Sequence, residues 1–146
     1  MTERDNDVAG NDVAPNDVVG DDAVDIRVPA RGVYVATLRL AATSLAARCD
    51  LTVDDIDDLG LAVDEACALL LPHAEPKTML SAHFTLESGS LAVTTSVSSP
   101  DASTASPDRN GFAWSVLSAL ASEVTVSGDG DDLSITVTKR REIAPT

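Results

Sequence analysis

The strands predicted in the second half of the chain are apolar on one side only. In each strand, inward residues alternate with residues that are mostly serine and threonine, and side chains two positions apart share a face. The inward sets are Leu80, Ala82, Phe84 and Leu86, then Leu91, Val93, Thr95 and Val97, then Leu133, Ile135 and Val137. A sheet with one apolar and one Ser/Thr-rich face is covered by helices on one face only. We therefore predict an α+β fold, a two-layer sandwich with a mixed sheet and helices on one face.

Two amphipathic helices are predicted before these strands. The first spans residues 32–48, where apolar residues recur at helical spacing: Val35, Leu38, Ala42, Leu45 and Ala46. The second begins after Thr52, a residue type that caps helices, with Asp55 three positions on. Its inward face comprises Ile56, Leu59, Val63, Ala66, Cys67 and Leu70. The acidic residues of its first turns suit the positive end of the helix dipole.

The remaining elements complete a single domain over residues 25–140. A strand with Ile26 and Val28 comes first and ends at Pro29. After the second and third strands, a loop SSPDASTASPDRN leads to a short helix over residues 111–121, and a last hairpin turns at GDGDD. We expect residues 141–146 to be a flexible C-terminus.

Residues 1–24 are predicted to form a disordered acidic tail. They contain the degenerate repeat NDVAG, NDVAP, NDVVG and DDAVD, whose period is too short for a solenoid and whose composition is too acidic for a core. Two roles stay open for the tail. It is either a solvating leader or a segment that masks or steers a basic partner.

The charge balance and the apolar runs limit the partners and the compartment. The chain has 24 acidic and 10 basic residues, a net charge of −14, which repels nucleic-acid phosphates and attracts basic surfaces. We expect no direct nucleic-acid binding. There is no apolar run of membrane-spanning length, and the start MTERDNDV lacks signal-peptide features, so we expect no membrane contact and a cytoplasmic location. The isolated Cys49 and Cys67 favour buried, reduced thiols over a disulfide or a metal site.

Glu65 lies in the middle of the second helix, in the string LGLAVDEACALLLPH. An Asn four residues later would place a carboxylate and an amide on one helix face, as a base beside a metal ligand requires. This chain has Leu69 at that position, and a leucine offers no lone pair to Mg²⁺. Glu65 is therefore either a site residue or an ordinary solvated or paired carboxylate.

Three strings carry a resemblance to a known family: RVPARGVYVATLRLA, LTVDDIDDLGLAVDEAC and NGFAWSVLSALASEVTVS. In order and spacing, they resemble the anti-sigma-factor serine kinases. That family is a branch of the Bergerat-fold (GHKL) ATPases, which include the ATPase domains of histidine kinases. The resemblance covers about Ile26 to Lys139, and the chain resembles a degenerate member of actinobacterial type.

The resemblance implies roles for particular residues. Glu65 would be the general base, while the Mg²⁺-holding Asn is replaced by Leu69. The family's adenine-binding Asp-x-Gly is missing, because the nearest carboxylate, Asp101, is followed by Ala102 and Ser103. The glycine-rich phosphate turn becomes Gly111-Phe112-Ala113, which keeps one glycine. For Phe112 and Trp114, and for both histidines, core packing is the alternative that we favour over a ligand role.

The resemblance also implies partner-binding residues. Arg39 matches an arginine that lies, in this family, on the surface shared by sigma factor and antagonist. Its alternative is an ordinary exposed helix arginine. An acidic face could meet a basic sigma-factor surface, or could simply be a solvated helix start; its residues are Asp54, Asp55, Asp57 and Asp58.

These observations predict an anti-sigma factor that sequesters an alternative sigma factor of the stress-response or sporulation type. An anti-anti-sigma antagonist would relieve it, nucleotide binding would be lost or weak, and no cofactor or metal is expected. One alternative is a working serine kinase that uses ATP and Mg²⁺ to phosphorylate that antagonist; another is an acidic protein-binding adaptor. Homodimers are common in the resembled family, although no residue pattern here marks an interface.

Overall fold

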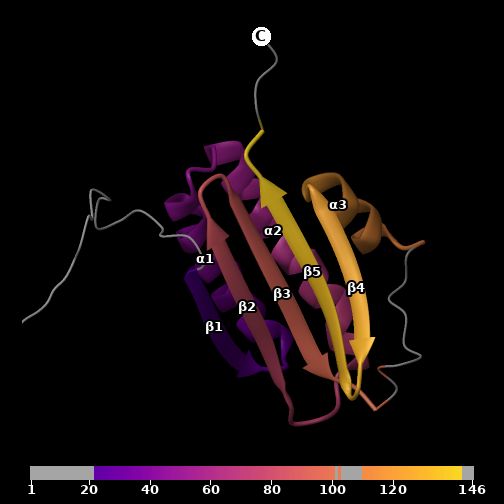
Figure 1. The fold of residues 1–146 in the computed structure, drawn as a ribbon. Helices are drawn as coiled ribbons and strands as arrows, with labels where there is room; N and C mark the ends of the chain where they lie inside the picture. The colour runs from indigo at the N-terminus through magenta and orange to yellow at the C-terminus, as the bar shows by residue number, and fades with distance from the viewer. Residues whose placement is uncertain (1–21, 101, 103–109, 143–146) are drawn as a thin grey trace, which may run out of the picture.

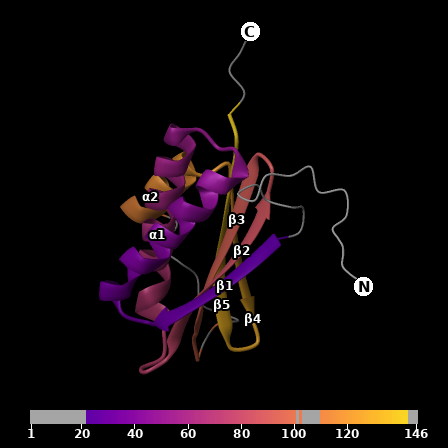
Figure 2. The same cartoon turned by 90° about the vertical axis from the view of Figure 1, so that its left-hand side faces the viewer.

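A computed structural model describes residues 22–100, 102 and 110–142 of the chain and shows two layers. Five strands form one sheet, and helices cover one of its faces, as Figures 1 and 2 show. In chain order the elements are β1 (Asp22–Pro29), α1 (Val35–Ala46), α2 (Val53–Leu70), β2 (Met79–Glu87), β3 (Ser90–Ser98), α3 (Phe112–Leu120), β4 (Glu123–Asp129) and β5 (Asp132–Arg140). This arrangement confirms the predicted α+β two-layer fold.

The strand order is β1-β2-β3-β5-β4, and all four pairings are antiparallel. The prediction of a mixed sheet is therefore wrong for the described strands. Two helices between β1 and β2 return the chain to the end of the sheet where β1 stops, so β2 runs back along β1. The strands β3 and β4 run in the same direction, but β5 lies between them (Figure 1).

The core lies between the sheet and the helices, and α2 is its central helix, with α1 and α3 packed against its two sides. Its largest fully buried side chains include Phe84 of β2, Leu91 of β3, Ile135 of β5, and Leu38 and Leu59 of the helices. Burying a side chain of this size contributes roughly 1.5–3 kcal/mol. The opposite face of the sheet has no helix over it among the described residues (Figure 2).

Local signals set the element boundaries. Thr52 and Asp55 form a capping box, in which the Thr52 hydroxyl accepts from the Asp55 amide at 3.1 Å and the Asp55 carboxylate accepts from the Thr52 amide at 3.3 Å. The tight turn between β4 and β5 uses Gly130 at φ +61°, so the predicted hairpin at GDGDD is confirmed. Strand β1 begins at Asp22, three residues before the predicted domain boundary. The rest of the predicted tail, and residues 143–146, lie outside the described residues.

Candidate functional site

Glu65 and Leu69 occupy neighbouring turns of one side of α2, and their environments differ. Glu65 is half-buried and makes no hydrogen bond or ion pair with any residue that the structure describes. Leu69 is only 8% exposed and belongs to the hydrophobic core. The position that would complete a base-and-metal pair is thus a packed apolar side chain, and Glu65 has no oxygen ligand beside it at that spacing.

The predicted phosphate turn, Gly111-Phe112-Ala113, lies at the start of α3. Gly111 is the N-cap residue in an extended conformation, and no side chain caps the helix. The Phe112 side chain is 82% exposed, whereas Ala113 and Trp114 pack against the core. The prediction of core packing is therefore confirmed for Trp114 and wrong for Phe112, which is the first residue of the helix and points away from the packed layer. Among the described residues of this turn, the backbone amides are the groups that could bind a phosphate.

The segment after β3 is where the family resemblance places an adenine-binding carboxylate. Two of its described residues are buried, since Ser99 is fully buried and Ala102 is 2% exposed, whereas Pro100 between them is exposed. The Ser99 amide donates to the Asp131 carbonyl at 2.7 Å, which fastens this segment to the β4–β5 turn. Asp101 lies outside the described residues.

Arg39 is held by an ion pair with Asp64, the residue before Glu65. One guanidinium nitrogen of Arg39 lies 2.9 and 3.1 Å from the two carboxylate oxygens of Asp64, joining α1 to α2. The Arg39 side chain is 40% exposed and that of Asp64 is 25% exposed. Arg39 is therefore oriented by its partner and still open to solvent.

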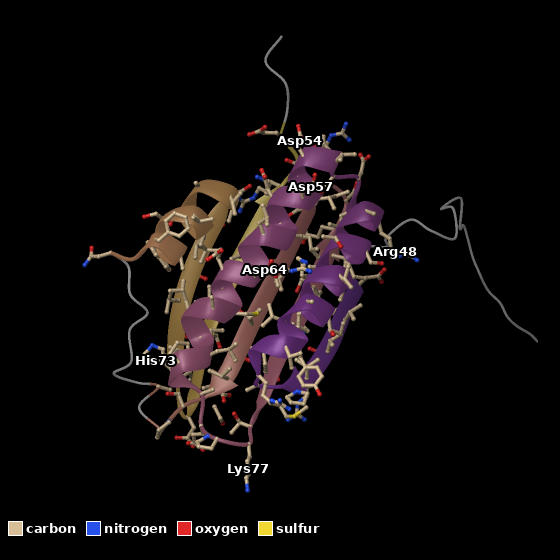
Figure 3. All side chains as sticks on the ribbon, turned by 180° about the vertical axis from the view of Figure 1, so that it is seen from behind. Arg48, Asp54, Asp57, Asp64, His73 and Lys77 are labelled. Atoms are coloured by element: carbon tan, nitrogen blue, oxygen red, sulfur yellow. The ribbon has the colours of Figure 1, made fainter. Side chains whose placement is uncertain are left out.

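The four aspartates at the start of α2 do not form one surface. Asp54 and Asp57 are exposed, and Figure 3 shows them with Asp64 along α2. Asp55 is 2% exposed, and Asp58 accepts from the buried ammonium of Lys139 at 3.3 Å. The prediction of a partner-binding role is thus wrong for Asp55, because the capping box turns its carboxylate inward. The exposed acidic surface consists of Asp54 and Asp57.

The pKa of Asp55 reflects this buried position. Burial acts to raise the pKa of the carboxyl, but hydrogen bonds with Thr52 and with the Glu142 amide, and the nearby charge of Lys139, outweigh it. The pKa is therefore lowered from its ordinary value, and the carboxylate form is stabilised by folding.

A groove lies between the outer sides of α1 and α2; we call it the helix groove. It encloses about 420 Å³, and it is lined by Arg39, Leu40, Thr43, Asp57, Gly60 and Leu61. Leu40 and Leu61 are 64% and 52% exposed, unusually open for leucines. The groove therefore combines two apolar side chains with an oriented cation and an exposed carboxylate, which suits contact with a protein surface better than bond-making chemistry.

The two cysteines are not placed as reactive thiols. Both Cys49 and Cys67 are buried and free, as predicted. Burial, together with the nearby Asp64 charge, raises the pKa of Cys67 to about 12, which makes its thiol a poor nucleophile.

Within the described ranges there is no group of three or more His, Cys, Asp or Glu residues placed to hold a metal ion. None of the helices in those ranges combines the length and apolarity needed to span a bilayer.

A family model described as "Histidine kinase-like ATPase domain" matches residues 28–139. The chain belongs to the histidine kinase-like ATPase domain family. It is also similar to proteins named serine-protein kinase RsbW: those of Bacillus thuringiensis strain Al Hakam and Bacillus cereus strain B4264 are each 37% identical over 51 residues, or 35% of this chain. The match spans 32% of the length of these relatives.

Among solved structures, the chain is similar to the RsbU and RsbW domains of Rv1364c from Mycobacterium tuberculosis. The TM-score is 0.60 at 19% sequence identity, over 84% of this chain and 35% of that one. At this identity the likeness concerns the fold. It agrees with the family assignment from the sequence.

Of the residues that line the helix groove, Arg39 and Asp57 were predicted to bind a partner, whereas Leu40 and Leu61 were not, although two sequence signals point to them. Leu40 and Leu61 lie outside the apolar stripes of their helices, so neither has a place in the core. Gly60 lies in a helix interior, where glycine costs about 1 kcal/mol relative to alanine. A Cβ at Gly60 would lie 2.9 Å from Cγ2 of Thr43, so glycine permits the close approach of α1 and α2.

Proposed function

We propose that this protein is an anti-sigma factor of the histidine kinase-like ATPase fold, which sequesters an alternative sigma factor and has lost most or all of its nucleotide binding. An antagonist protein then releases the sigma factor by competing for the same surface. The partner classes come from the family resemblance, and the similarity to RsbW proteins supports them.

The observation that carries the loss of nucleotide dependence is the burial of Leu69. Phosphoryl transfer depends on positioning the phosphates and on neutralising their charge with a metal ion. An apolar core residue at this position removes the oxygen ligand expected one turn after Glu65, and it cannot swing out without opening a cavity. On this proposal, the domain that matches the family model keeps its scaffold, and a core leucine occupies the position where the resemblance implies a metal ligand.

The helix groove is the surface that we assign to the sigma factor. The exposed leucines Leu40 and Leu61 would take apolar side chains of the partner, and Asp57 would meet a basic residue at the rim. Arg39, oriented by Asp64, would bind a carboxylate or a carbonyl group. Such a mixed surface agrees with a partner that is exchanged rather than permanently held.

Copurification from the native host at low salt, followed by mass spectrometry, tests the partner class. We expect an alternative sigma factor to copurify with the tagged full-length chain, and Leu40→Asp to abolish its recovery without loss of folding, since Leu40 is 64% exposed. Phe112→Asp, which also changes an exposed apolar residue but lies outside the groove, is the matched control. Recovery of no sigma factor, or equal loss in both variants, would contradict the proposal.

A second candidate, an ATP-dependent serine kinase, is favoured by one observation. Glu65 is half-buried and unpaired among the described residues, as a general base awaiting its substrate would be. The relatives also carry the name serine-protein kinase. Incubation with radiolabelled ATP, Mg²⁺ and the antagonist protein decides between the two. Label on the antagonist that disappears with Glu65→Gln establishes the kinase, and absence of label with intact sigma-factor binding establishes the stoichiometric inhibitor.

A further inference from the structure

The face of the sheet opposite the helices carries ordered rows of hydroxyl groups. Strand pairing places Arg27 of β1 beside Ser81 of β2, Ser81 beside Ser96 of β3, and Ser96 beside Ser134 of β5. Directly paired residues on one face have their Cβ atoms about 4.5–5.5 Å apart. A continuous row of serine hydroxyls therefore starts at an arginine at the sheet edge.

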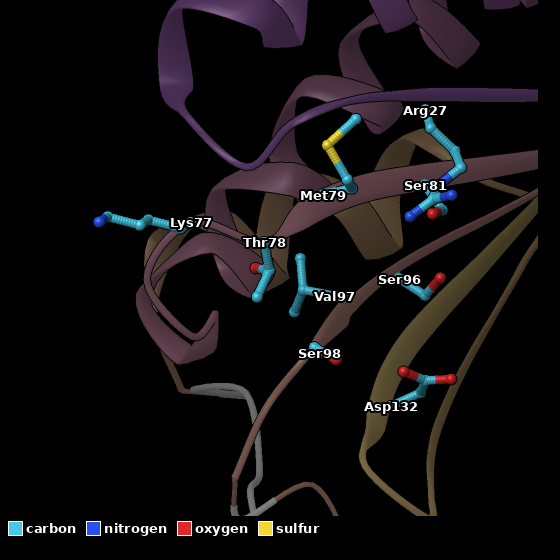
Figure 4. A pocket seen from close by; sticks show the side chains of 9 residues that line it. All are labelled: Arg27, Lys77, Thr78, Met79, Ser81, Ser96, Val97, Ser98 and Asp132. Atoms are coloured by element: carbon cyan, nitrogen blue, oxygen red, sulfur yellow. The ribbon is translucent and has the colours of Figure 1, made fainter.

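A cleft of about 440 Å³ lies at one end of this face, and we call it the sheet cleft. Its polar lining includes Arg27, Ser81, Ser96, Ser98 and Asp132, with Lys77 at the rim; Figure 4 shows Arg27 and Asp132 on different strands and the Lys77 side chain directed away from the other residues. Ser98 pairs with Asp132, so the carboxylate lies one row below the serine row. The cleft is thus cationic at one end, hydroxyl-lined in the middle and anionic at the other end.

Arg27 and Lys77 are the two described cations that have no partner in the structure. The other described arginines and Lys139 all make contacts. Four of these residues form ion pairs: Arg39 with Asp64, Lys139 with Asp58, Arg140 with Glu123, and Arg141 with Asp50. Arg31 lies over the Tyr34 ring, and Arg48 also has an interaction partner. In a chain of net charge −14, carboxylates are plentiful. Both unpaired cations nevertheless line the same cleft.

We propose that the sheet cleft binds the phosphate monoester of a polyhydroxylated small molecule, of the sugar phosphate class. The Arg27 guanidinium binds the phosphate through parallel N–H donors. The serine hydroxyls, which both donate and accept, bind hydroxyl groups along the ligand. The Asp132 carboxylate accepts hydrogen bonds from hydroxyl groups at the far end of the ligand and does not contact the phosphate.

The dimensions and charges of the cleft favour this class over a bare anion. Arg27 and Asp132 lie three strand spacings apart, or about 14 Å between backbones, and the arginine side chain spans part of that distance. The net charge of the protein opposes anion binding, although charges more than about 8 Å away are largely screened at physiological salt. One guanidinium must therefore be helped by contacts with hydroxyls along the cleft, and inorganic phosphate bound at Arg27 is too small to reach most of them.

Titration of the full-length chain with glucose 6-phosphate, inorganic phosphate and glucose, followed by amide chemical shifts, tests the proposal. We expect saturable shifts at Ser81, Ser96 and Ser98 with glucose 6-phosphate, weaker shifts with phosphate and none with glucose. Arg27→Gln should weaken glucose 6-phosphate binding by about tenfold or more, because a charged hydrogen-bond donor is lost. Arg140→Gln, at an exposed arginine outside the cleft, should leave binding unchanged.

Asp132→Asn separates the two ends of the cleft. It should weaken glucose 6-phosphate binding, since the ligand's hydroxyl donors lose a charged acceptor, and leave phosphate binding unchanged. Equal affinity for phosphate and glucose 6-phosphate would overturn the assigned ligand class. Absence of shifts with either anion, or binding that survives Arg27→Gln, would overturn the site itself. The thermal midpoint of each variant shows that the fold is retained.

Discussion

The buried ammonium of Lys139 joins three elements at one point. Its Nζ atom donates to the Leu120 carbonyl at 2.8 Å, near the end of α3, and to the Asp58 carboxylate of α2 at 3.3 Å. The side chain itself, on β5, is only 9% exposed. The lysine therefore satisfies a helix-end carbonyl that has no partner within its own helix.

Replacing this lysine should cost stability even when its volume is kept. We expect Lys139→Met to lower the free energy of unfolding by about 1–3 kcal/mol, because the Leu120 carbonyl loses its donor inside the packed layer. Urea denaturation measures the change. Arg140→Met, one residue on, removes an exposed ion pair with Glu123 and should cost less than about 1 kcal/mol. Equal costs for the two variants would show that the Lys139 contacts contribute little.

Asp55 gives the protein a predictable loss of stability in acid. Its pKa is lowered by folding from an ordinary value of 3.8, so its contribution is fully present above that value and is lost as the pH falls through the lower folded pKa. Asp55→Asn should destabilise the protein by about 0.5–2 kcal/mol near neutral pH, the size of a helix-cap effect.

The measurement for Asp55 is urea denaturation of both proteins across the acid range. The difference in unfolding free energy should be constant at neutral pH and should shrink once the pH falls below the ordinary carboxyl range. Asp54→Asn, at the exposed neighbour, should show no such pH-dependent difference. A difference that stays constant down to the acid unfolding of the wild type would contradict the assignment.

Among the elements, α1 and α2 can cross closely because Gly60 of α2 has no side chain at the crossing. Gly60→Ala would gain helix propensity of about 1 kcal/mol, but the new Cβ would lie 2.9 Å from Cγ2 of Thr43. We expect a net destabilisation of about 1–3 kcal/mol from overpacking. Thermal denaturation measures it.

Thr43→Ser provides the control for this crossing, because serine lacks the Cγ2 methyl and keeps the hydroxyl that donates to the Leu40 carbonyl. The double variant Gly60→Ala with Thr43→Ser should recover most of the loss. If the double variant is as unstable as Gly60→Ala alone, the close approach of these two atoms is not the cause.

The sequence predicts most elements well because their signals are local. Alternation at period two identifies β2, β3 and β5, and the Thr52 cap marks the start of α2 to the residue. The position of β5 between β3 and β4 has no such local signal, because pairing partners are chosen by the whole sheet. The burial of Asp55 and the exposure of Phe112 also depend on packing between elements. The sequence predicts an exposed Asp55 and a buried Phe112, and both predictions are wrong.

At the scale of the whole molecule, the net charge of −14 should govern how fast a basic partner arrives. If a sigma factor binds at the helix groove, its association rate constant should fall as ionic strength rises, since steering is screened by salt. Asp54→Asn with Asp57→Asn should slow association several-fold at low salt and flatten the salt dependence. Stopped-flow mixing measures the rate.

Asp129→Asn with Asp131→Asn is the matched control, since it removes the same charge from the β4–β5 turn, away from the groove. This pair should slow association less than the pair at the groove does. Equal slowing by both pairs would mean that total charge, and not the acidic surface at the start of α2, steers the partner.

The place of β5 in the sheet sets the order in which the protein can be assembled during translation. β5 is the last of the five described strands in chain order, yet it holds β4 to the rest of the sheet and covers the edge of β3. Until residues 132–140 have left the ribosome, β4 has no strand to pair with and α3 lacks its contact with Lys139. Until β5 has emerged, the nascent chain therefore exposes the edge of β3 and an unpaired β4, and the sheet cannot be completed before then.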